Sequence, residues 1–247
     1  MNRLLLNSIQ TIPLLCLLIF SSFSYAIDPK TYIPPQAFTH KETIKSELDK
    51  HFPDIPTYNY VPALIEHESC LSLSHSRCWN STSELRTKRE QGLGLGQTTR
   101  TFREDGSIRF DTLTEMRRNY MSELKEASWD TFKYRPDLQI RMIILHLRTD
   151  YSRLYEFNDP LVRLHATDAA YNGGRGAVNF NRRACGLAKG CDPQLWFGHA
   201  ERYSNKSTKI LYGNRSARDI FFDHPRDVFF NRLPKYEKQY FTETAIN

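Results

Sequence analysis

The residues best suited to acid–base chemistry lie in the segment 60–70, with the sequence YVPALIEHESC. Pro62 suits the first turn of a helix, where its missing N–H costs no hydrogen bond. On that helix Glu68 falls at the edge of an apolar stripe, where partial desolvation favours the protonated carboxyl near neutral pH. Glu66 stands two positions earlier and faces a different way. We therefore predict that Glu68 is a general acid and that Glu66 is a surface charge.

Two glycine-containing segments could frame such an acid. Residues 92–97 read GLGLGQ, and glycine at alternate positions predicts a tight turn that allows close approach of another part of the chain. The spacing and the lack of a preceding strand argue against a dinucleotide site. Asp159 followed by Pro160 begins a helix, and Asn172-Gly173-Gly174 ends it. Both segments are therefore candidates for the walls of a cleft.

The N-terminal segment of the chain indicates export. Residues 1–26 read as a signal peptide, with Arg3, a short apolar run and the cleavage site Ser24-Tyr25-Ala26. An uncleaved signal anchor is the alternative. Residues 27–59 are expected to form an arm and a short helix, and residues 60–247 a globular domain. We predict an exported protein of the periplasm or cell envelope.

Composition and cysteine count narrow the partners. The 34 basic residues exceed the 28 acidic ones, for a net charge of +6, which suits an anionic polymer or cell-wall surface and also plain solubility. Four of the five cysteines follow the signal peptide, so two disulfides are expected, with Cys70–Cys78 and Cys185–Cys191 preferred among three possible pairings. A metal site formed by Cys70, His75 and Cys78 is the disfavoured alternative. We expect no metal, no cofactor and no nucleic-acid partner.

Hydrophobic periodicity predicts helices over most of the mature chain. The expected elements are a helix capped by Thr39 and Glu42, helices near 113–124 and 138–155, a helix over 161–171, a loop or solvated helix at 79–91 and a basic, loop-like insert at 175–192. Phe221, Phe222, Val228, Phe229 and Phe230 are expected to anchor the C-terminal part. Strand patterns are nearly absent. The predicted fold class is all-α, a single globular domain with loop inserts.

Three motifs now stand in one order: Glu68-Ser69, Gly94-Leu95-Gly96-Gln97, and Ala170-Tyr171-Asn172-Gly173-Gly174. Their order resembles that of the soluble lytic transglycosylases of glycoside hydrolase family 23, which share a fold with goose-type lysozyme. The resemblance covers residues 60–175, with Tyr236 as the late tyrosine of that family. It implies a lysozyme-like fold.

The resemblance also implies an activity, the cleavage of the MurNAc–GlcNAc bond of peptidoglycan with formation of a 1,6-anhydro end. Glu68 would be the single acid and base. The residues expected to orient it or to contact sugar are Ser69, Gln97, Tyr171, Asn172 and Tyr236. Gly96 departs from the methionine usual at its position. The spacing from Glu68 to Gln97 is longer than usual, and a Cys70–Cys78 bond would tether this insert close to the acid.

Two other functions remain open. The first is a hydrolytic lysozyme, in which Asp168 or another acid activates water; Asp168 could otherwise simply pair with His165 on the same helix. The second is a catalytically silent glycan-binding subunit of an envelope-spanning machine. In either case the partner is the peptidoglycan glycan strand. The arm and the extra loops suggest attachment to a secretion, conjugation or phage-related apparatus.

Overall fold

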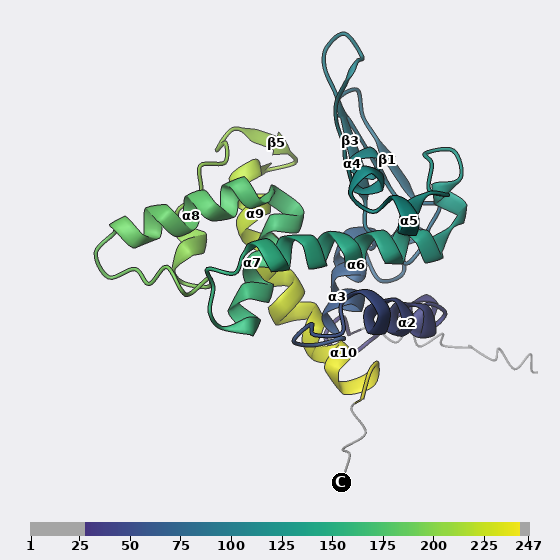
Figure 1. The fold of residues 1–247 in the computed structure, drawn as a ribbon, viewed down its shortest axis with the longest axis horizontal. Helices are drawn as coiled ribbons and strands as arrows, with labels where there is room; N and C mark the ends of the chain where they lie inside the picture. Colours follow the sequence, from purple (N-terminus) through teal and green to yellow (C-terminus); the bar gives the residue numbers. More distant parts are fainter. Residues whose placement is uncertain (1–27, 243–247) are drawn as a thin grey trace, which may run out of the picture.

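The structure is a computed structural model that describes residues 28–242, and within this range the chain forms a mainly helical single domain with a small antiparallel sheet. The helix α6 crosses the middle of the domain, and the sheet stands out from one side of the helical body (Figure 1). The helices are α1 (Pro35–Phe38), α2 (Lys41–His51), α3 (Tyr60–Ser69), α4 (Thr112–Asn119), α5 (Met121–Leu124), η1 (Phe132–Tyr134), α6 (Pro136–Arg153), α7 (Pro160–Gly173), α8 (Arg175–Leu187), η2 (Ala200–Arg202), α9 (Ala217–Arg226), η3 (Asp227–Arg232) and α10 (Leu233–Gln239). The strands are β1 (Glu84–Arg86), β2 (Glu90–Leu93), β3 (Thr98–Phe102), β4 (Ile108–Asp111), β5 (Ile210–Tyr212) and β6 (Arg215–Ser216).

The buried helix α6 is the centre of the packing. It begins at Pro136, as predicted, and packs between α2 and α7. Ile140, Ile144 and Leu147 are fully buried within it. Apolar side chains cover most of its circumference, which is the pattern of a helix surrounded by other elements.

The helix α3 lies against the C-terminal helical segment η3 and α10. Tyr60 of α3 stacks on Phe229 of η3, with ring centroids 5.3 Å apart. Helical backbone runs without a break from α9 through η3 to α10, and η3 is a π-helical stretch. Such stretches are frequent at functional sites. Here η3 brings Asp227 and Arg232 next to α3, whereas Phe230, expected to be an apolar anchor, is 55% exposed.

The four-stranded sheet corrects the prediction of an all-α fold. Each strand pairs antiparallel with the next in the order β1-β2-β3-β4, and Gly92 pairs with Thr99. Residues 79–91, expected to be a loop or a helix, contribute β1 and the start of β2. These strands are three to five residues long and largely polar. Over so few positions, the alternation of apolar and polar residues that identifies a strand cannot be recognised.

Two further segments differ from prediction. Residues 175–187, expected to be part of a loop-like insert, form the helix α8, in which Ala177, Val178, Asn181 and Cys185 make the buried face. The helix expected near 113–124 is divided into α4 and α5. Of the basic residues of α8, Arg183 is exposed, whereas Arg175 pairs with the buried Asp150 and Arg182 lies over the ring of Phe157.

The N-terminal segment packs into the main core. Ile44, Leu48 and Phe52 are fully buried, in agreement with their predicted periodicity. The predicted capping box does not form, because Thr39 Oγ1 donates to the carbonyl oxygen of Gln36. Lys235 Nζ donates to the carbonyl oxygen of Pro29, which ties the start of the described chain to α10.

Both predicted disulfides are present, Cys70–Cys78 and Cys185–Cys191. They are consistent with an oxidising location outside the cytoplasm. The first bond also occupies two of the three ligands that the alternative metal site requires. Within residues 28–242, no helix is both long and apolar enough to cross a membrane. The predicted signal peptide lies outside the described residues.

Candidate active site

Glu68 lies at a pocket between the helical body and the sheet. The pocket has a volume of about 540 Å³, which is within the range of small-ligand sites. Its lining includes Glu68 and Ser69 from α3, Gly92 from β2, Gln97 after the next turn, Asn172 from α7 and His224 from α9. The tertiary structure thus brings residues from all three sequence motifs to one cavity.

Glu68 is held at one oxygen. Its Oε1 accepts a hydrogen bond from His224 Nε2 at 2.8 Å, and its side chain is 15% exposed. Among residues 28–242, no other side chain or backbone group hydrogen-bonds to this carboxyl. The second oxygen therefore has no protein partner there, and the carboxyl lines the pocket. This arrangement suits a group that exchanges a proton with a bound molecule.

His224 continues into a buried chain of hydrogen bonds. Its Nδ1 lies 2.7 Å from Asp168 Oδ1, and Tyr60 donates its hydroxyl proton to Asp168 Oδ2 at 2.9 Å. Asp168 is fully buried, and the side chain of His224 is 2% exposed. In the chain Tyr60–Asp168–His224–Glu68, Glu68 is therefore the carboxyl that reaches the pocket.

The two carboxylates decide the protonation of His224. Burial alone would lower the pKa of His224, but Asp168 and Glu68 outweigh it and raise the pKa to about 10. An imidazolium has two N–H donors, and each one meets a carboxylate oxygen. A neutral imidazole would leave one of these contacts without a proton. His224 is therefore positively charged at neutral pH.

The sequence did not point to His224, and the predicted partner of Asp168 was wrong. His224 is 156 positions from Glu68 in the chain and belongs to no recognisable motif. Asp168 does not pair with His165, whose ring instead lies 4.6 Å from that of Phe197 and 4.4 Å from that of Phe229. Both oxygens of Asp168 are occupied and buried, so it is not placed to activate water.

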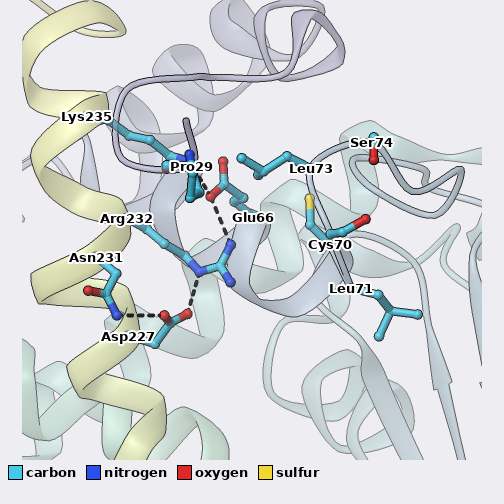
Figure 2. Close-up of a pocket in the computed structure, with 11 residues that line it drawn as sticks. Pro29, Glu66, Cys70, Leu71, Leu73, Ser74, Asp227, Asn231, Arg232 and Lys235 are labelled. Carbon is cyan, nitrogen blue, oxygen red and sulfur yellow. Dashed lines mark hydrogen bonds and ion pairs between the residues drawn. The ribbon is translucent and has the colours of Figure 1, made fainter. Parts of the chain in front are cut away.

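Glu66 is not the surface charge that the sequence predicted. It is fully buried, and its Oε1 pairs with Lys235 Nζ at 2.7 Å and with Arg232 Nη1 at 2.9 Å (Figure 2). Tyr236 donates its hydroxyl proton to Glu66 Oε2 at 2.7 Å. Tyr236 therefore holds Glu66 rather than Glu68, which corrects its predicted place beside the acid. Both oxygens of Glu66 are occupied by fixed side chains.

A second pocket, of about 360 Å³, adjoins Glu66, Arg232 and Asp227. Arg232 bridges the two carboxylates there, and Asn231 Nδ2 donates to Asp227 Oδ1 at 3.0 Å. Because each charge in this cluster already has a partner of opposite sign or a hydrogen bond, the cluster reads as a structural ion-pair network that fixes α3 against η3 and α10.

Ser69 holds the loop that follows α3. Its Oγ donates to the carbonyl oxygen of Ile65 at 2.7 Å and accepts from the backbone N–H of Trp79 at 3.1 Å. The disulfide between Cys70 and Cys78 closes the same loop. The hydroxyl proton of Ser69 is thus committed to the backbone, although the residue lines the pocket.

The turn after β2 packs under Tyr171. Gly94 and Gln97 both have positive φ, 75° and 42°, and Gln97 Nε2 donates to the carbonyl oxygen of Gly94 at 2.9 Å. Tyr171 donates its hydroxyl proton to the carbonyl oxygen of Gly96 at 2.8 Å. A Cβ at Gly96 would lie 2.6 Å from both Ile143 Cγ1 and the Tyr171 hydroxyl. Glycine is therefore required at position 96 by this packing.

Of the predicted sugar contacts, Asn172 is the most available. It is exposed at the pocket, and its side chain makes no hydrogen bond within the described part of the chain. The Gln97 amide serves its own turn through Nε2 but also lines the cavity. Tyr171 acts mainly in packing. Burial, with Glu68 and Asp168 nearby, raises the pKa of Tyr171 well above its ordinary value, so the hydroxyl stays protonated.

The pocket carries charges of both signs on its rim. Arg77, Arg215 and His67 line it, as do Glu84 and Glu90 from the sheet. Arg215 pairs with Asp223 at 2.9 Å. Glu84 accepts from Gln91 Nε2 at 2.8 Å. The two glutamates are the carboxylates that share this pocket with Glu68.

No protein-family model matches this chain, and no curated protein matches it either. The functional assignment therefore depends on the motifs and on the geometry of the pocket.

Proposed function

We propose that this protein is a peptidoglycan lytic transglycosylase that cleaves the β-1,4 bond between MurNAc and GlcNAc and leaves a 1,6-anhydro-MurNAc end. One observation carries the proposal: Glu68, with one oxygen that has no hydrogen-bond partner among residues 28–242, shares a pocket with Gln97 and Asn172. The order of the three motifs, which resembles that of family 23 enzymes, supports it.

In the first step, Glu68 would give its proton to the oxygen that leaves with GlcNAc. The bond from this oxygen to C1 of MurNAc breaks, and positive charge develops at C1. The N-acetyl group of the same sugar can stabilise this charge from within the substrate. The exposed amide of Asn172 and the amide of Gln97, which line the same pocket, would hold the sugar while this happens.

In the second step, the same carboxylate would act as a base. The 6-hydroxyl of MurNAc attacks C1, a C1–O6 bond forms, and Glu68 takes the hydroxyl proton back. No water is consumed, and the enzyme returns to its starting protonation state. A single carboxyl in two roles is sufficient for this sequence.

The proposed location is the periplasm or the cell envelope. Two disulfides and the predicted signal peptide support it, since disulfides persist in oxidising compartments. The partner would be the glycan strand of peptidoglycan. Attachment to a secretion, conjugation or phage-related apparatus is part of the same proposal and rests on the extra loops and arm of the chain.

A hydrolytic lysozyme is the second candidate, because Glu84 and Glu90 line the same pocket as Glu68. One of them would have to activate water. Asp168 is not available for this role, since His224 and Tyr60 occupy its two oxygens. A Glu84→Gln or Glu90→Gln variant would lose activity if the enzyme were hydrolytic by this route.

Digestion of purified sacculi followed by mass spectrometry tests the proposal. We expect anhydro ends from the wild-type protein and none from Glu68→Gln. Glu115→Gln, an exposed position on α4, is the matched control and is expected to retain activity. Reducing ends would identify a lysozyme. A well-folded wild-type protein that releases no fragments would identify a glycan-binding subunit.

A further inference from the structure

The side chain of His224 is placed to act on Glu68 during the proton transfer. It is buried and reaches Oε1 of Glu68 at 2.8 Å, whereas Oε2 of Glu68 has no hydrogen-bond partner within residues 28–242. Its other nitrogen is anchored 2.7 Å from Asp168, and Asp168 is in turn fixed by Tyr60. Such a fully connected buried chain holds its members in one geometry.

We propose that His224, anchored by Asp168, is a positioning residue that fixes one oxygen of Glu68 and stabilises the negative charge left on Glu68 when its proton goes to the sugar. This proposal rests on the proposed function, in which Glu68 is the acid. It assigns to the buried chain a part in the chemistry that none of the sequence motifs indicates.

The strength of the hydrogen bond from His224 depends on the charge of Glu68. When Glu68 is protonated, His224 donates to a neutral carboxyl; when Glu68 has released its proton, the same N–H donates to a carboxylate. A hydrogen bond from an imidazolium to a carboxylate is stronger than one to a neutral carboxyl. The interaction therefore strengthens as the proton leaves, which is the condition for lowering a barrier rather than only binding tightly.

Several other titratable groups lie near His224. His224 contacts Glu68 and His67 from α3 and Asp168 from α7, and Arg215 from β6 lines the same pocket as His224. His67 is bound to Asp227 at 2.6 Å, Arg215 is paired with Asp223, and Arg226 with Glu201. The two carboxylates that contact His224 directly are Glu68 and Asp168. They also account for the raised pKa of His224.

The pH–rate profile of peptidoglycan cleavage tests the proposal. Without the imidazolium, the carboxylate of Glu68 loses the positively charged donor on its Oε1. We expect His224→Gln to move the alkaline limb of the profile upward by about one pH unit or more, while the maximal rate falls about tenfold or more. Asp168→Asn should move the limb in the same direction, because it removes the anchor of the imidazolium. A purely structural role would lower the rate or the stability without moving the limb.

His165→Gln is the matched control. It also removes a largely buried imidazole from the helical body, but His165 packs against phenyl rings and does not contact Glu68. Its alkaline limb should coincide with that of the wild type. A limb that moves equally in His165→Gln and His224→Gln would overturn the proposal.

A measurement on the wild-type protein separates this proposal from the proposed function. In ¹⁵N NMR spectra of labelled protein, we expect both ring nitrogens of His224 to be protonated at pH 7.5. A neutral His224 at that pH would overturn the inference even if Glu68 cleaves peptidoglycan. A charged His224 in a protein that releases no anhydro ends would instead sink the proposed function. This test holds even if the His224 variants do not fold.

Discussion

The two glutamates of α3 should separate stability from activity, although they stand only two positions apart. Glu66 is buried with Lys235, Arg232 and Tyr236 on its oxygens, whereas Glu68 faces a pocket and, in the described part of the chain, has His224 as its one hydrogen-bond partner. Replacing each in turn with glutamine keeps its shape and removes its negative charge. We expect Glu66→Gln to lose stability and Glu68→Gln to lose activity.

The structure allows both magnitudes to be worked out. The side chains of Glu66 and Lys235 are each 1% exposed, and their ion pair measures 2.7 Å. Removing one partner of such a pair leaves the other charge buried, at a cost of about 3–5 kcal/mol. For a domain of this size this lowers Tm by about 6–20 °C. In Glu68→Gln, the amide oxygen can still accept from His224, so the cost is about 1–2 kcal/mol, while cleavage falls by about 10²–10⁴-fold.

Thermal unfolding and sacculus digestion on the same preparations provide the assay. Digestion is compared at 20 °C, where Glu66→Gln is expected to be folded, and far-ultraviolet circular dichroism confirms the helix content. Glu66→Gln should retain most of its cleavage rate per folded molecule. A Glu66→Gln protein with wild-type Tm and no activity would refute the reasoning, because it would make Glu66 the acid.

Three further predictions follow from the packing. Cys78→Ser and Cys191→Ser each remove a disulfide that closes a short loop, so each should lower stability by about 2–3 kcal/mol. Of these two variants, only Cys78→Ser should reduce cleavage, because its disulfide closes the loop beside Glu68. Gly96→Ala should lose about 1–3 kcal/mol of stability, because the added Cβ would collide with Ile143 and with the hydroxyl of Tyr171. Gly176→Ala, at an open position on α8, should gain about 0.5–1 kcal/mol of stability. Burial lowers the pKa of His165 to about 4. As the pH falls, the unfolded state therefore binds a proton at this histidine at a higher pH than the folded state does. The free energy of unfolding should decrease as the pH drops from about 6.5 to 4. His165→Gln should reduce that fall.

Each of these predictions has a direct measurement. Urea unfolding at pH 7 gives the cost of the cysteine and glycine substitutions, and sacculus digestion gives their effect on cleavage. Equal activity loss from Cys78→Ser and Cys191→Ser would contradict a special role for the first loop. A stable Gly96→Ala protein would mean that the turn can move away from Tyr171. For His165, an identical pH dependence of unfolding in variant and wild type would show that its burial does not affect protonation.

Local signals in the sequence were sufficient for several elements. Pro136 and Asp159-Pro160 marked the starts of α6 and α7, and Gly173-Gly174 marked the end of α7. Pro62 was correctly placed in the first turn of α3. The disulfides followed from short separations between cysteines. These features depend on residues close together in the chain, so composition and spacing are enough to predict them.

The sheet and the charge partners required the tertiary structure. The strands β1 to β4 are short and polar, and the turn at Gly94 and Gln97 connects the paired strands β2 and β3 without an apolar pattern to mark them. The burial of Glu66 depends on Lys235 and Arg232, more than 160 positions away.

The sequence alone predicted that Glu68 belongs to a helix and that a glycine turn and a Tyr-Asn pair follow it, and it favoured the two disulfides that the structure contains. The folded structure was needed to find that His224 hydrogen-bonds to Glu68 and that Tyr236 hydrogen-bonds to Glu66. The physical reason is that helix starts and turns are set by local backbone preferences, whereas the partner of a carboxylate is set by which distant side chain the packing brings within about 3 Å. A single sequence contains no record of that distance.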